Sequence, residues 1–268
     1  MLDAVRAAIA GRPTGQPAAA ALRLRRTLVA FDPDPDRPRL PPARRKLLAA
    51  IAARGDVTVG LISGRPIADL QSRTALAATV YHAGLHGMQI EIEGRRWQHD
   101  DIDLARGALR TLKAALYGLK VGQPLVHFED KGASLAVHFR RVAVGARAAV
   151  RRSALAIARP WLEAGELRQR DGSAVVEFLP NIDWDKGRAA LWIARDMGSR
   201  TGQPAWTVYL GDDRTDEDVF RAITCGIGVR MGHRRTAADF TLGGRSEVDE
   251  LLTWFVQGHN ARSGDERS

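Results

Sequence analysis

Cysteine is almost absent from this sequence, since the 268 residues contain only Cys225. A single cysteine forms no disulfide within the chain, which excludes a small secreted domain held together by disulfides and fits a reducing compartment. Long apolar runs are absent too, because no stretch approaches the roughly 18 residues that a membrane-spanning helix needs. We therefore expect a soluble, cytoplasmic protein with no membrane partner.

Lysine is also scarce, although the chain is basic. Lysine and arginine number 40 against 31 acidic residues, which gives a net charge of +9. Only five of the 40 are lysines, and the arginines are spread among many alanines rather than gathered with aromatic residues in one stripe. A nucleic-acid-binding surface usually concentrates its basic residues. We predict no nucleic-acid partner, but a basic surface that attracts an anionic substrate.

The remaining composition is that of a globular protein, with 45% hydrophobic and 26% charged residues. This excludes a mainly disordered or fibrous architecture. Residues 1–25 are rich in alanine and arginine and contain a Gly/Pro break. We predict for them a peripheral helix and a linker, and we expect residues 259–268 to form a flexible tail.

Strand-like and helix-like segments alternate in the first and last thirds of the chain. The strand-like runs are residues 27–31, 57–62, 80–83, 207–210, 227–230 and 240–242. The helical patterns are residues 41–54, 67–77, 187–197, 216–223 and 247–256. Apolar strands that alternate with helices indicate an α/β fold whose parallel sheet is covered on both faces.

The middle of the chain follows a different pattern. Residues 102–180 contain helix–strand–strand twice, and the second pair of strands is predicted to turn at Asp171-Gly172. This order is typical of an α+β module with an antiparallel sheet. We therefore predict a discontinuous core, residues 26–101 and 181–258, with an inserted cap domain at residues 102–180.

Polar side chains follow the predicted core strands. Asp32 and Ser63 end the first two strands, Asp212 and Asp213 follow a later one, and Lys186 begins a helix. Ligands bind at the carboxyl ends of parallel strands, so we expect these residues to share a site. Carboxylates hold Mg²⁺, and a carboxylate can attack phosphorus to form an aspartyl-phosphate. Each residue alone also fits ordinary turn chemistry, but adjacent acids repel one another without a cation.

Seven short segments have the residues and the order of a known family. They are 61–65 (LISGR), 83–90 (AGLHGMQI), 129–132 (EDKG), 136–140 (AVHFR), 176–180 (VEFLP), 185–187 (DKG) and 210–218 (LGDDRTDED). Through them the chain resembles the trehalose-6-phosphate phosphatases of the haloacid dehalogenase (HAD) superfamily. The combination of the EDKG segment with the later GDD segment is specific to that family.

The resemblance implies a HAD-like, Rossmann-type core, a small α+β cap, Mg²⁺, and hydrolysis of trehalose 6-phosphate through an aspartyl-phosphate. It assigns the phosphate to Ser63 and Lys186, and the metal to Asp212 with Asp213 and Asp216 in support. It assigns the rest of the substrate to Arg65 and to the cap residues Glu129, Lys131, Arg140 and Glu177. Without the resemblance, Glu129 and Lys131 would be interpreted as a surface ion pair.

The first motif departs from the family's pattern, Asp-x-Asp-Gly-Thr, because residues 31–38 read FDPDPDRP. In one alignment, Asp32 is the nucleophile and Asp34 the general acid/base, and both ligate Mg²⁺. In the other, the motif after Asp32 is deleted, which the short spacing to Ser63 favours. Pro33 and Pro35 also lack the N–H donors of a phosphate cradle. We predict an active phosphatase, slower than a relative with the full motif. The alternative is an impaired or inactive relative that binds sugar phosphate as a sensor or partner subunit.

Overall fold

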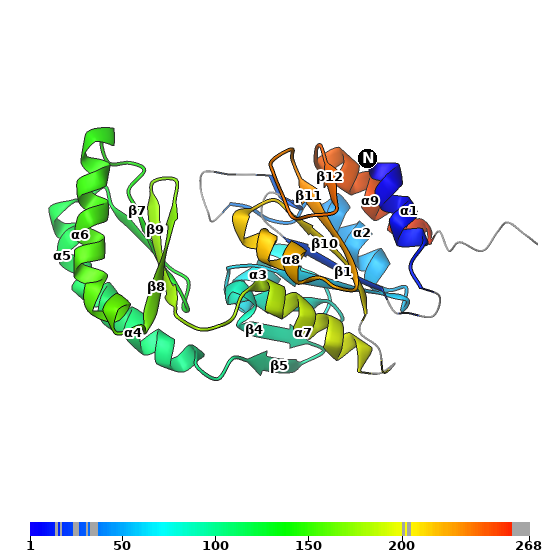
Figure 1. The fold of residues 1–268 in the computed structure, drawn as a ribbon, viewed down its shortest axis with the longest axis horizontal. Helices are drawn as coiled ribbons and strands as arrows, with labels where there is room; N and C mark the ends of the chain where they lie inside the picture. Colours follow the sequence, from blue (N-terminus) through cyan, green and yellow to red (C-terminus); the bar gives the residue numbers. More distant parts are fainter. Residues whose placement is uncertain are drawn as a thin grey trace, which may run out of the picture. The chain divides into compact units, whose positions relative to one another are not determined.

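A computed structural model describes residues 1–13, 16, 18–23, 27–30, 32, 37–199, 202 and 205–258 of the chain. Figure 1 shows its two compact units. The core unit consists of Met1–Trp97 and Trp184–Ser268, and the cap unit consists of Gln98–Asp183. The cap unit contains the predicted insertion, residues 102–180, with a few more residues at each end. The predicted tail, residues 259–268, lies outside the described residues.

The core is built on an eight-stranded sheet of order β12-β11-β10-β1-β2-β3-β4-β5. The pairs from β12 to β3 are parallel, as predicted, and β4 runs antiparallel to β3. The strands are β1 (Ala18–Arg23), β2 (Val57–Ile62), β3 (Tyr81–Gly84), β4 (Gln89–Ile92), β5 (Arg95–Gln98), β10 (Trp206–Gly211), β11 (Gly226–Met231) and β12 (Phe240–Leu242).

The prediction that residues 27–31 form the first strand is wrong. The sheet is completed by β1, which lies between β10 and β2 and pairs in parallel with both. Thr27 and Leu28 form a turn, and Val29 makes only an isolated bridge, while Phe31 lies outside the described residues. The prediction that residues 1–25 lie outside the core is also wrong, because they contribute a central strand and the buried side chains of Val5 and Ile9.

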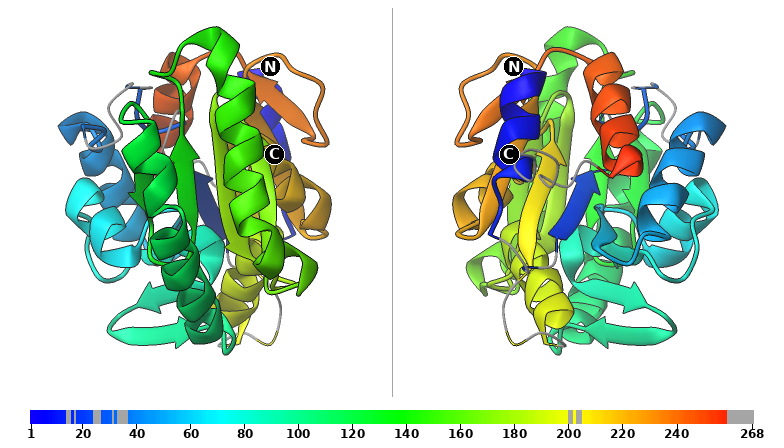
Figure 2. Two further views of the ribbon diagram at one scale, coloured as in Figure 1. Left: turned by 90° about the vertical axis from the view of Figure 1, so that its left-hand side faces the viewer. Right: turned by 90° about the vertical axis from the view of Figure 1, so that its right-hand side faces the viewer.

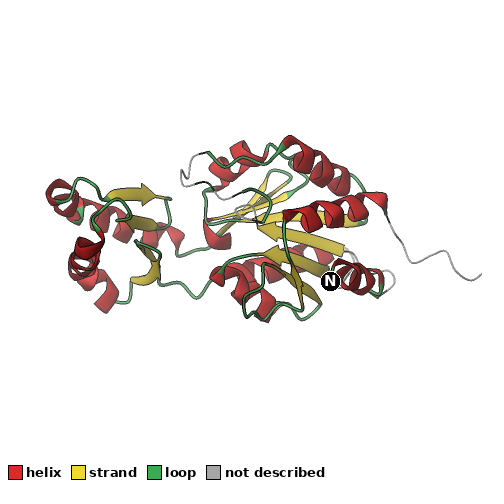
Figure 3. Cartoon of the chain, turned by 90° about the horizontal axis from the view of Figure 1, so that it is seen from above, coloured by secondary structure: helices red, strands yellow, loops and turns green. Residues whose placement is uncertain are grey.

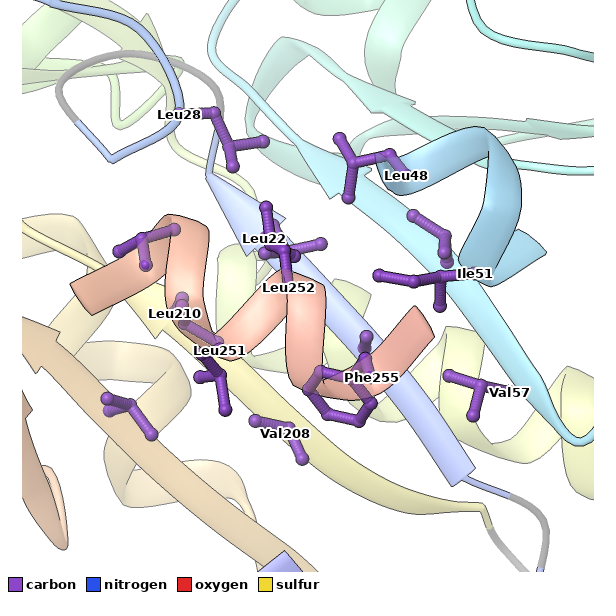
Figure 4. Close-up of a cluster of buried hydrophobic side chains, with 14 of the residues drawn as sticks. Leu22, Leu28, Leu48, Ile51, Val57, Val208, Leu210, Leu251, Leu252 and Phe255 are labelled. Carbon is purple, nitrogen blue, oxygen red and sulfur yellow. The ribbon is translucent and has the colours of Figure 1, made fainter. Parts of the chain in front are cut away.

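Helices cover both faces of the core sheet (Figure 3). They are α1 (Leu2–Ala10), α2 (Pro42–Ala52), α3 (Ile67–Thr74), α7 (Lys186–Gly198), α8 (Glu217–Ala222) and α9 (Arg245–Gln257), with short 3₁₀ helices η1 (Leu85–Gly87) and η2 (Arg214–Asp216). Side chains of α1, α2, α3 and α9 share one hydrophobic cluster with Leu22 of β1, much of which Figure 4 draws. Side chains of α7 and α8 share another with Ala21.

This division orients the end of β1. Successive side chains of a strand point to opposite faces of the sheet. Leu22 packs on the side of α2 and α9, whereas Ala21 packs on the side of α7 and α8. Arg23, the last residue of β1, therefore shares the α7/α8 side with Tyr209 of β10, which belongs to the same cluster as Ala21.

The cap unit contains an antiparallel sheet of order β6-β7-β9-β8. Its strands are β6 (His127–Asp130), β7 (Leu135–His138), β8 (Leu167–Gly172) and β9 (Val175–Pro180), and its helices are α4 (Ile102–Ala115), α5 (Tyr117–Gly122) and α6 (Val144–Glu163). In Figure 2, α4 and α6 lie over this sheet, and their apolar side chains share one cluster with it. The β8–β9 turn falls at Ser173-Ala174 rather than at Asp171-Gly172, because Gly172 still pairs with Val175.

None of the helices in the described part of the chain has the length and apolar character that crossing a membrane requires.

Candidate functional site

The carboxyl ends of three neighbouring parallel strands form one edge of the core sheet. Asp212 follows β10, Arg23 ends β1, and Ser63 follows β2, in that order across the sheet. The prediction that Asp32 ends the first strand is wrong, because β1 ends nine positions earlier, at Arg23. Asp32 is half-buried, and Asp34 lies outside the described residues. The central position at this edge is therefore occupied by an arginine rather than by a carboxylate.

The guanidinium of Arg23 contacts three carboxylates, which we call the acidic cluster. Arg23 Nε lies 3.3 Å from Asp212 Oδ1, Nη2 lies 3.0 Å from Asp213 Oδ2, and Nη1 lies 2.9 Å from Asp216 Oδ2. Only 12% of the Arg23 side chain is exposed. Thr27 Oγ1, which is buried, donates to Asp212 Oδ1 at 3.4 Å. Each nitrogen of the guanidinium thus has its own carboxylate partner.

Asp216 holds the acidic cluster together from inside the protein. Its Oδ1 accepts hydrogen bonds from Lys186 Nζ at 2.8 Å and from the Tyr209 hydroxyl at 2.9 Å. Its Oδ2 accepts the backbone N–H groups of Asp212 and Asp213, both at 2.9 Å, in addition to Arg23. The Asp216 side chain is completely buried. Every oxygen of this carboxylate is therefore surrounded by donors.

Glycine at position 211 permits this packing. A Cβ atom on Gly211 would lie 2.6 Å from Cβ and Cγ of Asp216, which is closer than real side-chain contacts come. The chain then turns into η2, where the Asp213 and Asp216 side chains form a capping box. The Gly-Asp-Asp sequence after β10 thus has a local structural reason, because it brings Asp216 back against the end of the strand.

The charges of this cluster stabilise one another. Burial alone would raise the pKa of Asp216, but Lys186 and Arg23 lower it far below its usual range. Burial alone would lower the pKa of Arg23, but Asp216, Asp212 and Asp213 raise it. The pKa of Lys186 is lowered, first by burial and then by the nearby charge of Arg23. Arg23 and Asp216 are therefore both ionised at neutral pH.

The structure brings together four of the predicted core residues. Lys186 and Asp216 are in direct contact, and Asp212 and Asp213 join them through Arg23. Ser63 is half-buried, and its Oγ accepts the backbone N–H of Arg65 at 3.2 Å. The guanidinium of Arg65, which precedes α3, pairs with Asp69 in the first turn of that helix.

Sequence reasoning missed Arg23, Tyr209 and Thr27. The signal that identifies Arg23 is its spacing to Thr27: residues 23–27 read Arg-Leu-Arg-Arg-Thr, where the family's motif reads Asp-x-Asp-Gly-Thr. In this alignment the threonine is retained, and arginine stands at both acidic positions. Residues 24–26 lie outside the described part of the chain, so the comparison of position 25 rests on sequence alone.

The Mg²⁺ ion that the family implies beside Asp212 does not fit these residues. Mg²⁺ prefers oxygen ligands at about 2.0–2.1 Å in octahedral geometry. Asp212 Oδ1 instead contacts Arg23 Nε and Thr27 Oγ1, and the other carboxylates of the acidic cluster also contact Arg23. Across the described residues, no group of three or more His, Cys, Asp or Glu side chains is placed to hold a metal ion.

The cap unit has a polar cluster of its own. Glu129, Ala136, Glu177 and Arg170 are paired in one row across the four strands. Lys131 Nζ lies 2.7 Å from Glu177 Oε1 and 3.9 Å from Glu129 Oε2. The apolar cluster between the sheet and the helices includes Val137, which follows Ala136 in the chain, and Val176, which precedes Glu177. The row therefore lies on the sheet face opposite the helices.

Two further residues of the cap join this cluster, and one predicted residue does not. Ser134 Oγ donates to Glu177 Oε1 at 2.9 Å, and His138 Nε2 lies 2.9 Å from Glu129 Oε2. Neither Ser134 nor His138 was predicted. Arg140 was predicted to join the site, but it is exposed beyond the end of β7. Its Nη2 donates to the Ser173 carbonyl at 3.3 Å.

Known proteins are similar to this chain in sequence and in fold. Residues 26–243 match the model of the family described as Trehalose-phosphatase. A relative named Trehalose-phosphate phosphatase from Mycobacterium tuberculosis is 35% identical over 230 residues, 81% of this chain and 56% of the relative. The chain thus spans little more than half the length of such curated relatives.

Solved structures show the same fold at low sequence identity. One is described as a trehalose-6-phosphate phosphatase related protein (TM-score 0.75, 18% identity, 90% of this chain and 97% of the other). Another is the C-terminal domain of a Candida albicans trehalose synthase regulatory protein (TM-score 0.71, 13% identity, 95% and 97% covered). These likenesses show the HAD-like fold alone. The family match and the identity to the mycobacterial protein together show that this chain belongs to the trehalose-phosphatase family.

Proposed function

We propose that this chain binds trehalose 6-phosphate, or a closely similar disaccharide phosphate, and does not hydrolyse it through an aspartyl-phosphate. The observation that carries the proposal is Arg23 at the end of the central strand β1, in contact with the acidic cluster. Of the two hypotheses from the sequence, this is the non-catalytic relative that acts as a sensor or partner subunit.

The chemistry of arginine supports this proposal. Covalent phosphoryl transfer needs a nucleophile with an available lone pair, such as a carboxylate. A guanidinium is a donor only and stays protonated in proteins. By sequence, Arg25 stands two residues later, where the family has its second aspartate. An arginine at that position offers no general acid or base for the leaving group.

The binding half of the proposal uses residues that the resemblance to the family assigns to the substrate. Ser63 and Lys186 would bind the phosphate, with Arg65 beside them. In the cap, Glu129, Lys131 and Glu177 would bind sugar hydroxyls, with Arg140 as a further contact. Charged groups form strong hydrogen bonds to hydroxyls and phosphates. The close contacts between Lys131 and the two glutamates support an arrangement of donors and acceptors in one cluster.

Phosphatase activity on trehalose 6-phosphate is the second candidate, and membership of the family favours it. That family is one of phosphoric monoester hydrolases, and the mycobacterial relative carries the phosphatase name. For this chain to follow the family's reaction, Asp32 would act as nucleophile and Asp34 as acid/base, with Mg²⁺ bound. The separation of Asp32 from the end of β1 counts against this route.

The two candidates are separated by measuring binding and turnover on the same preparation. We expect calorimetry to detect trehalose 6-phosphate binding. We expect phosphate release at least about 10²-fold slower than by the mycobacterial relative, because loss of acid/base catalysis alone costs about 10²–10⁴-fold. Release within about tenfold of that relative, abolished by Asp32→Ala, would establish the phosphatase instead. Absence of binding would refute both candidates.

A further inference from the structure

We infer that the guanidinium of Arg23 replaces the divalent cation at this site, so that sugar phosphate binds without Mg²⁺. The inference rests on the proposed function and deepens it. It concerns what neutralises the acidic cluster of Asp212, Asp213 and Asp216, and therefore which ion the site accepts.

The charges at this site require a cation. Three carboxylates at the turn after β10 repel one another unless cations lie between them. Lys186 Nζ pairs with Asp216, at 2.8 Å. Arg23 contacts each of the three, at 2.9–3.3 Å. Among the described residues, the guanidinium is thus the cation that lies against all three carboxylates, which is the position of a bound metal ion in a carboxylate site.

Arg23 occupies the space beside the carboxylates that Mg²⁺ would need. Arg23 Nε and Nη1 lie 3.3 and 2.9 Å from oxygens of Asp212 and Asp216. A Mg²⁺ ion about 2.0–2.1 Å from the same oxygens would have to share their lone pairs with these nitrogens. It would also lie next to a positive charge that is nearly buried, so the repulsion would be weakly screened. Guanidinium and Mg²⁺ therefore exclude each other here.

The backbone and the side chain of Arg23 are both held in place. Its backbone is the last residue of β1 paired with β2, opposite Ile62. Its side chain is 12% exposed, and leaving the cluster would break three ion pairs at once. Asp216, the innermost partner, has no exposed surface at all. Millimolar Mg²⁺ would have to displace a cation that the chain carries permanently.

The test compares Mg²⁺ binding by the wild-type chain and by Arg23→Ala. Four of the six residues of β1 are already alanine, so the strand is expected to form with alanine at position 23. We expect no Mg²⁺ binding by wild type in calorimetry. We expect Arg23→Ala to bind Mg²⁺ at least about tenfold more tightly, and its melting temperature to rise in millimolar Mg²⁺ because a ligand of the native state stabilises it.

Arg44→Ala is the matched control. The Arg44 side chain is likewise 12% exposed and pairs with one carboxylate, Asp249, away from the acidic cluster. We expect this variant to gain no Mg²⁺ binding. If Arg23→Ala does not fold, Arg23→Gln, which keeps hydrogen-bond donors and loses the charge, takes its place with the same expected gain.

The second measurement is the affinity of the wild-type chain for trehalose 6-phosphate in Mg²⁺ and in EDTA at equal ionic strength. We expect the two values to agree within about twofold, a difference far below 1.4 kcal/mol. Mg²⁺ binding by wild type as tight as by the Arg23 variant, or sugar-phosphate binding that EDTA abolishes, would overturn this inference. Either result would leave the proposed binding function standing, whereas rapid phosphate release would overturn that function instead.

Discussion

Asp216→Asn tests whether the acidic cluster is a buried charge network on which folding depends. The side chain keeps its size but loses its charge and one of its two acceptor oxygens. Five donors converge on those oxygens: Lys186, Tyr209, Arg23 and the backbone N–H groups of Asp212 and Asp213. The amide –NH₂ would have to face at least two of these donors.

The expected loss of stability follows from burial. The Lys186 and Asp216 side chains are 3% and 0% exposed, so the variant leaves the Lys186 ammonium without its buried partner. Breaking such a pair from one side costs about 3–5 kcal/mol. Since a domain is stable by only about 5–15 kcal/mol, we expect Asp216→Asn to lose a large part of its free energy of unfolding.

The assay is urea denaturation at neutral pH, with Asp171→Asn as control. Asp171 also pairs with an arginine, Arg151, but the two side chains are 49% and 37% exposed. Exposed pairs contribute about 0–1 kcal/mol, so the control should barely change. We also expect Lys186→Met to cost less in the Asp216→Asn background than in wild type. Equal, small losses for Asp216→Asn and Asp171→Asn would refute the network.

Three further predictions concern the core, the cap and the pH dependence of folding. Leu48→Ala, a fully buried position in the cluster of Figure 4, should cost about 2–5 kcal/mol in chemical denaturation, whereas Leu104→Ala, at a side chain 78% exposed, should cost almost nothing. Lys131→Ala should weaken trehalose 6-phosphate binding at least about tenfold, because charged hydrogen bonds are lost. The control Lys113→Ala removes an exposed ion pair with Asp130 and should leave the affinity unchanged. Equal effects of the two variants in calorimetry would contradict a sugar-binding role for Lys131. Burial lowers the pKa of His82 in the folded chain, so the unfolded state binds a proton at this histidine first as the pH falls below about 6.5. From that pH downward, His82 should therefore decrease the free energy of unfolding by at most about 1.4 kcal/mol per pH unit. The variant His82→Gln should make this dependence on pH less steep.

Local sequence patterns determined most of the architecture. The strand at Val57–Ile62 was predicted with its observed bounds, because a continuous apolar run bounded by turn residues fits a strand buried on both faces. The alternation of strands and helices likewise predicted the parallel sheet and the separate antiparallel cap sheet. The contact of Lys186 with Asp216 and that of Lys131 with Glu177 join residues that sequence analysis had already selected.

Only the tertiary structure decided which residue stands at the centre of the site. Residues 27–31 look more like a strand than Ala18–Arg23, because alanine is a poor strand former and β-branched and aromatic residues are good ones. The alanine run nevertheless becomes the central strand, since β10 and β2 supply hydrogen-bond partners along both of its edges. Arg23 then meets Asp212, Asp213 and Asp216, which lie about 190 positions away in the chain. A buried charge is stable only beside its partners, and no local pattern specifies partners that the fold alone brings together.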